Sequence, residues 1–531
     1  MKNSFYNTLT YAKFILKREK KYFIIWFVSL LLLTVGQAQS LADMYPTAED
    51  RSEVARSMDN PAIIALMGLP YGKNDYNMGA LLSQQTLLFA AVALAIMNII
   101  FIIRNTAADE EKGISDTLLA FPVGKQFQIA ASLVVSFAVN VVFTAVISIG
   151  LCSLKIDGID TKGSLAFGAV MCVAGVFFAA VSAAFAQISP SNSMGLSFGI
   201  LGISYFVRAI GDIGNEVIAC ISPLGALMRS QVYVKNGFAP ILIVLAAALV
   251  FAAAAVWLNT KRDYGSGIFV NKTNKKTTSE FLRSPLTLAV RLLFVSTVAW
   301  IVGFLIMGFS FGGMLEEIKS QLEKNDMMKQ IFITDDNTAI LDQFISVMTS
   351  ITAIIATVPS VLAILRIRSE ESSGRLDIIM SHKVSRVSII GSYFFIAIII
   401  SIILQLVFAV SMWIGGMTVL KDPIKLSYFI KAAVSYLPAI WLTIGLFTLM
   451  IGIFRKGIML AWLYYGYSVF VIYFGSMLKL PEAASKLTAY GNIPNVNIDG
   501  SNYTSIICIT VIFAVLSAAG FIGYKRADIT N

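Results

Sequence analysis

Two acidic segments of this chain combine residue types and spacing that could perform a specific task. Both lead from an apolar stretch into a short polar region, and Gly374 lies 261 positions after Gly113 (374 − 113). Arg386 follows Lys125 by the same distance (386 − 125). A gapless match over this length indicates an internal repeat. The segments contain Asp109, Glu110, Glu111 and Gly113 in the first copy, and Glu370, Glu371 and Gly374 in the second.

The carboxylates of each segment suit either a helix start or a docking contact. We expect one acidic, helical, water-facing element per copy, and the macrodipole of a helix stabilises acidic side chains in its first turn. Helix capping alone therefore explains the carboxylates. It does not explain why Val123-x-Lys125 and Val384-x-Arg386 recur at the same distance downstream. This recurrence favours a docking surface for a cytosolic protein.

The sequence offers no other site for chemistry. The only two Gly-Lys pairs, at 72–73 and 124–125, lack the following Ser or Thr of a phosphate-binding loop. A single histidine, His382, excludes catalysis by a histidine-bound metal. The four cysteines have no paired spacing. We therefore expect no catalytic residue, no metal site and no cofactor bound by this chain.

The composition places the acidic segments in a membrane protein. Of 531 residues, 57% are apolar and only 14% are charged, which excludes a soluble enzyme of ordinary composition. Apolar runs that approach the length of about 20 residues needed to cross a bilayer recur along the chain. They lack the alternation of a membrane β-barrel, so the prediction is an all-α polytopic protein with about twelve transmembrane helices. The runs lie near residues 22–38, 81–103, 127–150, 165–188, 193–211, 238–258, 287–308, 344–365, 389–416, 428–453, 457–476 and 503–522.

A basic stop after the last apolar run of each half extends the repeat. Lys525-Arg526 follows Lys261-Arg262 by 264 positions (525 − 261). Because each half has an even number of spans, the copies run in the same direction and form a parallel repeat. The predicted domains are a first six-helix half at 1–262, a cytoplasmic linker at 263–285 and a second six-helix half at 286–531.

The distribution of charge predicts the orientation. Residues 259–291 are mostly basic and are expected to be cytoplasmic, whereas 39–80 and 309–343 are acidic and are expected to be external. Both termini are then cytoplasmic. The net charge of +10 needs no nucleic acid, since anionic lipid headgroups would meet the basic segments. The first run is predicted to be a retained helix rather than a cleaved signal peptide, preceded by an amphipathic segment, Phe5 to Lys20, on the inner surface.

Polar residues within the apolar runs are the remaining candidates. Asn98, Asn140, Arg208 and Gln405 are possible substrate-pathway residues, and the alternative is that each forms hydrogen bonds with a neighbouring helix. Arg208 has Asp212 four positions later, so an ion pair near the outer interface is also open. The apolar segment 61–70 is too short to span the membrane. It is predicted to form a short helix over the outer mouth.

The chain resembles a known family along almost its whole length. The residues that carry the resemblance are 104–113 with 118–125, their second copy at 368–386, and the exit Lys261-Arg262-Asp263-Tyr264-Gly265-Ser266-Gly267. They look like the fused, twelve-helix permease subunits of bacterial type-2 ABC exporters, the group that includes polyketide and other antibiotic exporters. The second copy differs by having Ser372-Ser373 for Glu111-Lys112 and Lys383 for Pro122.

This resemblance implies a function and partners. In that family the acidic cytoplasmic element is the coupling helix that docks on the ATPase, which is usually a separate chain. We therefore expect two copies of a cytosolic ATPase subunit, with ATP and Mg bound by that partner. The cargo is expected to be an antibiotic or another hydrophobic compound that leaves through the bacterial cell membrane. The alternative, an ATP-independent secondary transporter, is disfavoured because the apolar runs hold almost no Asp or Glu.

Overall fold

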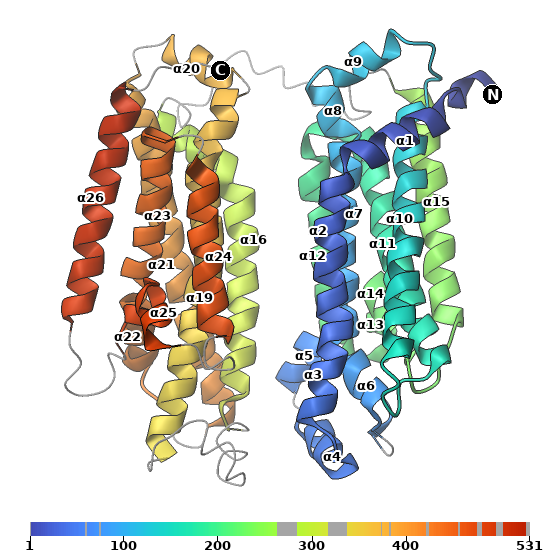
Figure 1. The fold of residues 1–531 in the computed structure, drawn as a ribbon, viewed down its shortest axis with the longest axis horizontal. Coiled ribbons are helices and arrows are strands. Elements are labelled where there is room, and N and C mark those ends of the chain that lie inside the picture. Colours follow the sequence, from blue (N-terminus) through green and yellow to red (C-terminus); the bar gives the residue numbers. More distant parts are fainter. Residues whose placement is uncertain are drawn as a thin grey trace. The chain divides into compact units, whose positions relative to one another are not determined.

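The computed structural model divides the chain into two compact units, Met1–Thr273 and Asn274–Asn531. Within the residues that the structure describes, every regular element is a helix (Figure 1). Most of the predicted linker, residues 263–283, and most of the predicted external loop, residues 317–336, lie outside the described residues, as does His382. The described residues are 2–58, 61–73, 76–262, 284–316, 337–372, 374–381, 384–420, 424–454, 457–474, 481–494 and 503–526.

The first unit begins with a short surface helix and then forms six long helical spans. Its shorter helices are α1 (Thr8–Arg18), α4 (Ala48–Ser57), α5 (Pro61–Met67), α8 (Ala107–Glu111), α9 (Ile114–Leu119), α13 (Glu216–Ile221) and α14 (Pro223–Met228). The spans are built from α2 (Lys20–Leu31) with α3 (Gln37–Met44), α6 (Met78–Leu82) with α7 (Leu88–Arg104), α10 (Phe127–Ser153), α11 (Thr161–Ile188), α12 (Ser193–Ile213) and α15 (Ala239–Lys261). In the first two spans a π-helical turn joins the pieces, at Leu32–Gly36 and Ser83–Leu87.

The second unit repeats this order with fewer described surface helices. Its long helices are α16 (Pro285–Gly313), α19 (Asn337–Ser372), α21 (Arg386–Val419), α22 (Leu426–Ser435) with α23 (Leu437–Gly452), α24 (Ile458–Phe474) and α26 (Thr504–Arg526). Short helices α20 (Arg375–Met380) and α25 (Glu482–Lys486) follow α19 and α24.

The predicted membrane-spanning runs are confirmed as helices. Eleven described helical segments are long and apolar enough to cross a membrane, and the shorter apolar helix Ile458–Tyr473 occupies the remaining run. The prediction of an all-α polytopic membrane protein is therefore confirmed. Apolar side chains such as Ile149, Leu249 and Val295 are exposed on these helices, as expected where helices face lipid.

Small residues set the helix packing in each unit. In the first, a Cβ on Gly168 of α11 would lie 2.2 Å from Ser148 Oγ of α10. In the second, a Cβ on Gly312 of α16 would lie 2.1 Å from the carbonyl oxygen of Met412 in α21. Only glycine permits the helices to approach so closely at these positions. Close packing matters here because the hydrophobic effect does not drive helices together within the lipid.

The amphipathic N-terminal segment is confirmed as helix α1. Its buried face packs Tyr11, Ala12 and Ile15 against the unit, with the Tyr11 and Phe127 rings 4.9 Å apart edge to face. Leu9 and Phe14 are exposed on other sides of the helix. In Figure 1, α1 lies across the end of the first unit that carries α8 and α9, whereas α4, α5 and α6 lie at the other end.

Candidate functional sites

The two acidic segments form different local structures. In the first unit, α8 holds Asp109 and Glu110 in its first turn, and α9 follows after a turn at Gly113, whose φ is +70°. We call α8, this turn, α9 and the following turn to Gly124 the first acidic element. In the second unit, Glu370 and Glu371 belong to the last residues of α19, and Gly374 (φ +68°) leads into α20. A helix start therefore favours the carboxylates in the first unit only, since α19 places its pair at the opposite end of the helix dipole.

The predicted water-facing position is wrong for Asp109. This residue is only 5% exposed, and its carboxylate accepts a hydrogen bond from Arg18 Nη2 at 2.7 Å. Burial lowers the pKa of the Arg18 guanidinium, but the hydrogen bond to Asp109 and the negative charge of Asp109 raise it by more. The pKa of Arg18 is therefore above its ordinary value. Burial and the charge of Asp109 also raise the pKa of the nearby Tyr11 to about 12.

Glu110 is also directed into the protein, where it forms an ion pair with Arg262. The two side chains are only 8% and 5% exposed. Arg262 directly follows α15, the sixth span, so this pair joins the first acidic element to the end of that helix. Nearby, Lys125 Nζ donates to the Thr260 carbonyl at 3.2 Å and Asn259 Nδ2 donates to the Lys125 carbonyl at 3.2 Å.

The second unit uses its carboxylates in the same way. Glu370 is buried and accepts hydrogen bonds from Arg366 Nε at 3.0 Å and Arg375 Nε at 2.7 Å. Glu371 accepts a hydrogen bond at 2.7 Å from the hydroxyl of Tyr524, which lies in the sixth span of that unit. In both copies, then, the first carboxylate binds arginine and the second binds the end of the sixth span.

The N-terminal segment is attached to the first acidic element as well. Asn7 Nδ2 donates to the Pro122 carbonyl at 2.9 Å, and the backbone N–H of Gly124 donates to the Tyr6 carbonyl at 3.1 Å. Glu19, between α1 and α2, is 3.4 Å from Arg104 at the end of α7. Sequence reasoning interpreted the basic residues around Arg18 as lipid contacts and Arg262 as a topology signal, so it missed these partners.

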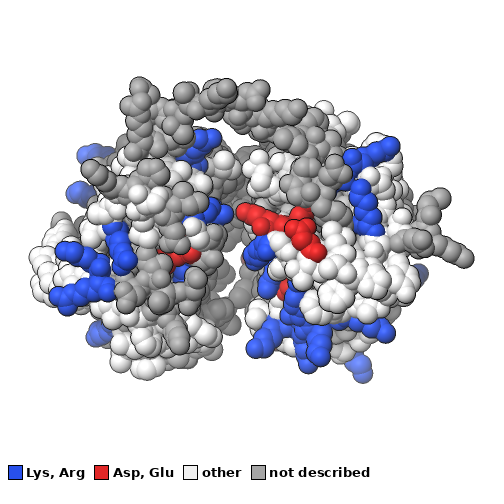
Figure 2. All heavy atoms as spheres, turned by 90° about the horizontal axis from the view of Figure 1, so that it is seen from above, with Lys and Arg blue, Asp and Glu red and all other residues white. Residues whose placement is uncertain are grey.

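The outward surface of the first acidic element is apolar as well as charged. Ile114 is 37% exposed and Phe121 is 62% exposed, with Glu111, Lys112 and Asp116 exposed beside them. Figure 2 looks onto this end of the unit and shows one compact acidic group with lysine and arginine side chains around it. Such a mixture of apolar and charged side chains suits contact with another protein.

Asn98 and Asn140 lie together at the centre of the first unit. Each side-chain amide donates to the other, at 3.0 and 2.8 Å, and both residues are fully buried. Ser136 Oγ also donates to Asn98 Oδ1 at 2.6 Å. These hydrogen bonds join α7 to α10, and Gly175 of α11 packs directly against the pair. The predicted hydrogen bonding between helices is confirmed, and a role in the substrate pathway stays a prediction.

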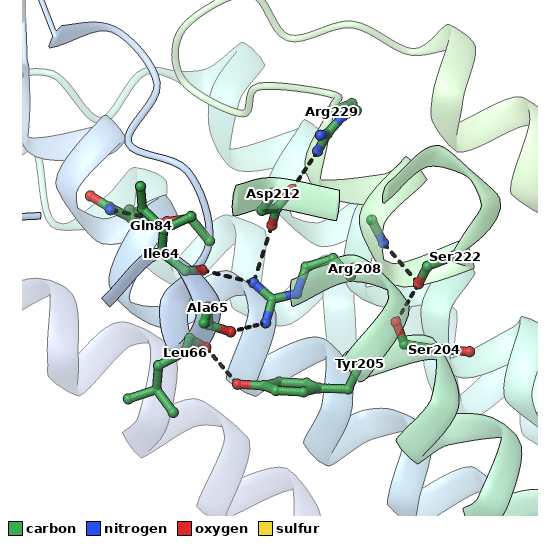
Figure 3. A network of polar contacts seen from close by, with 12 residues as sticks. Ile64, Ala65, Leu66, Gln84, Ser204, Tyr205, Arg208, Asp212, Ser222 and Arg229 are labelled. Carbon is green, nitrogen blue, oxygen red and sulfur yellow. Dashed lines mark hydrogen bonds and ion pairs between the residues drawn. The ribbon is translucent and has the colours of Figure 1, made fainter. Parts of the chain in front are cut away.

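Arg208 lies at the centre of a second polar network (Figure 3). Its side chain is 0% exposed, and Nη1 is 3.2 Å from Asp212 Oδ2, which confirms the pairing expected from their spacing. Asp212 Oδ1 is also 2.9 Å from Arg229 Nη1. The Tyr205 ring lies under the Arg208 guanidinium, with its centroid 4.6 Å from Cζ. The network joins α12 to the turn after α14.

Gln405 differs from the other polar candidates. It is 0% exposed in α21, and both its amide nitrogen and its amide oxygen lack a hydrogen-bond partner in the described residues. Four residues earlier, Ser401 Oγ accepts a hydrogen bond from Trp441 Nε1 at 3.1 Å. Gln405 belongs to the second unit, whereas the other three candidates all belong to the first.

The arrangement defines a class: a multi-pass helical membrane protein of two repeated units, each with an acidic element attached to its sixth span. Comparison with known proteins is consistent with this class. Residues 282–525 match the family model described as "Multidrug efflux system permease Rv1217c, C-terminal domain". The chain is 29% identical over 542 residues to the multidrug efflux system permease protein Rv1217c of Mycobacterium tuberculosis, covering 99% of this chain and 96% of the relative. The predicted resemblance to an exporter permease is confirmed.

Proposed function

We propose that this chain is the permease subunit of an ATP-driven exporter that moves antibiotics or other hydrophobic compounds out of the cell. The observation that carries the proposal is the full-length similarity to a multidrug efflux system permease. The paired acidic segments support it, because each is attached to the sixth span of its own unit and could pass on a movement of a bound partner. Two copies of a separate ATPase subunit, which would bind ATP and Mg, would dock on them.

In this proposal the docking surface is the exposed side of the first acidic element from the end of α8 to the turn after α9, with Glu111, Ile114 and Phe121. Asp109 and Glu110 act as positioning residues, because their carboxylates are used within the chain. Glu370 and Glu371 have the same role in the second unit. This revises the expectation that all these carboxylates contact the ATPase directly.

The attachments of the first acidic element provide a route for movement. A displacement of α9 would reach α1 and α2 through Asp109 and Arg18, and α15 through Glu110 and Arg262. ATP binding can drive export only if the ATPase binds the inward-open and outward-open states with different affinity. In this proposal the element transmits that difference to the first and sixth spans of its own unit.

The proposed orientation places α1, α8 and α9 in the cytoplasm and α4 and α5 outside. Both termini are then cytoplasmic. Basic residues near the end of α15 and acidic residues in α4 support this orientation through the positive-inside rule. Labelling of Glu53→Cys, but not Lys112→Cys, by an impermeant thiol reagent on intact cells would test it.

The function is tested by co-purification with a candidate ATPase and by measurement of cargo-stimulated ATP hydrolysis. We expect Phe121→Asp to abolish both association and stimulation, because it places a charge in the apolar part of the docking surface. Val217→Asp is the matched control, since Val217 is 70% exposed on α13 and lies away from this surface. ATP hydrolysis by the pure permease, or export that continues without the ATPase, would contradict the proposal. The second outcome would favour a secondary transporter.

A further inference from the structure

The short helix α5 is attached to α12 by its last carbonyl groups. Arg208 Nη1 donates to the Ile64 carbonyl at 3.2 Å and Nη2 donates to the Ala65 carbonyl at 2.6 Å. The Tyr205 hydroxyl donates to the Leu66 carbonyl at 2.6 Å. Figure 3 shows these three carbonyls directed at the side chains of α12. A cation at a helix C-terminus satisfies carbonyls that have no partner within the helix.

The counter-charge of Arg208 does not come from α5. Asp212 lies on the same helix as Arg208 and bonds Arg229 with its other oxygen. If α5 moved away, Arg208 would keep its ion pair and no buried charge would lose its partner. Loss of a charged partner is the costly event in a buried ion pair. The polar contacts of α5 can therefore be exchanged for water, and the rest of its attachment is apolar contact by the buried Ile63 and Ile64.

The chain beyond α5 is suited to a hinge. Gly68 directly follows the helix with φ +101°, and Gly72 has φ +77°, both in a region that L side chains rarely adopt. Next to Gly68 is a cavity of about 20 Å³, enough for one water molecule, which Gln84, Tyr71 and Met228 also line. Gln84 Nε2 donates to the Gly68 carbonyl at 3.3 Å.

We propose that α5 is a lid at the outer end of the first unit and that Arg208 is the latch that holds it closed. The lid rests on the proposed function, because its opening would release the cargo to the outside. Release breaks the bonds to the three carbonyls and leaves the Arg208–Asp212–Arg229 chain in place. Arg208 is then a positioning residue of the lid rather than a contact for the cargo.

The first experiment locks the lid. In a chain whose four cysteines are replaced by serine, Leu66→Cys and Tyr205→Cys are bridged by a reducible bifunctional thiol reagent about as long as a tyrosine side chain. We expect the bridge to stop ATP-dependent efflux of a fluorescent hydrophobic dye, and reduction to restore it, with ATPase association unchanged. Each single-cysteine variant treated alike is the control. Efflux at the parent rate with the bridge intact would overturn the proposal.

The second experiment needs no cargo and so separates the lid from the proposed function. Labelling of Ile63→Cys by an impermeant thiol reagent on intact cells measures opening of α5, because the Ile63 side chain is only 5% exposed while the helix is in place. We expect Arg208→Met to raise the labelling rate roughly tenfold or more, because both hydrogen bonds from Arg208 to α5 are lost, while Asp212 keeps its ion pair with Arg229. Tyr205→Phe is a second variant for the case that Arg208→Met does not fold. It removes one hydrogen bond and no charge, so we expect a smaller rise in its labelling rate. An unchanged labelling rate in the folded variants would overturn the role of Arg208 as a latch. If the unbridged parent failed to export the dye, that result would contradict only the proposed function.

Discussion

The carboxylates of the first acidic element differ in how deeply their side chains are buried. Glu110 and Arg262 are 8% and 5% exposed, whereas Glu111 is exposed. Removing one member of a buried ion pair costs about 3–5 kcal/mol because the other charge is left unpaired. An exposed ion pair is worth about 0–1 kcal/mol. The main effect of altering Glu110 should therefore be on the position of the element rather than on a contact at its surface.

A charge exchange tests this interpretation. We expect Glu110→Arg and Arg262→Glu each to lower the midpoint of thermal unfolding and weaken ATPase association, because each places two like charges together. The double variant should recover much of both, since the opposite charges are restored in reversed order. Direct docking of Glu110 on the ATPase predicts no recovery of association in the double variant, and that result would contradict the positioning role.

The paired amides of Asn98 and Asn140 allow a second test. A Cβ on Gly175 would lie 2.3 Å from Asn140 Oδ1 and 2.8 Å from Asn98 Nδ2. We expect Gly175→Ala to destabilise the protein by about 1–3 kcal/mol through overpacking. Gly202→Ala on α12, where the added carbon meets nothing within 4 Å, should not destabilise it. Thermal unfolding in one detergent compares the two, and equal midpoints would show that the amides tolerate displacement.

Residue-scale prediction succeeded where partners are close in sequence. The spacing of Arg208 and Asp212 indicated their ion pair, because four positions on a helix bring side chains together. The partners of Asp109 and Glu110 are 91 and 152 positions away. Those pairings depend on where the first and sixth spans end beside the acidic element, which no local pattern contains.

At the scale of the element, the helical runs were predictable but their ends were not. The run expected near 344–365 is part of one helix from Asn337 to Ser372, which includes Pro359. A membrane span tolerates an internal proline because neighbouring helices can form hydrogen bonds with the backbone groups that the proline frees. By contrast, α7 ends at Arg104 before α8 begins, so the two acidic elements differ in how directly they continue the second span.

The turn between α8 and α9 fixes the direction of the proposed docking surface. Gly113 has φ +70° and a Cβ there would meet nothing within 4 Å, so the only cost of alanine is backbone strain of about 1–2 kcal/mol. We expect Gly113→Ala to weaken ATPase association and Gly113→Asn to weaken it less, because asparagine tolerates this conformation. Gly303→Ala on α16, without positive φ, is the control. Association that is equally strong for all three would show that α9 is not oriented by this turn.

For the whole molecule, the internal repeat does not make the units identical. The offset of 261 that aligns the acidic segments places Pro359 at the position of Asn98 and Ser401 at that of Asn140 (359 − 98 and 401 − 140). The amide pair that joins α7 to α10 in the first unit therefore has no amide counterpart at these positions. The sequence comparison indicates the duplication, but the hydrogen bonds at these positions differ: Asn98 and Asn140 bond each other in the first unit, whereas Ser401 of the second unit accepts a hydrogen bond from Trp441.

Each unit has its own packed core, and this leads to a prediction for the whole chain. The buried apolar residues form one cluster from Tyr11 to Ala255 and another from Ala289 to Tyr524. The units divide after Thr273, within the segment that the sequence assigns to the linker. Helices in a membrane associate through close packing, and the tightest glycine contacts described above lie within a unit.

We therefore expect residues 1–273 and 274–531, expressed as separate chains, each to insert and purify as a folded species, and co-expression to restore ATP-dependent efflux. The matched control is a cut after Asp157, in the turn between α10 and α11, which divides the first core instead of separating the two cores. That cut should yield fragments that are degraded or aggregate. Size-exclusion chromatography and protection of backbone amides from hydrogen exchange would compare the two cuts. If both cuts were tolerated equally, the two packed cores would not be the folding units of this protein.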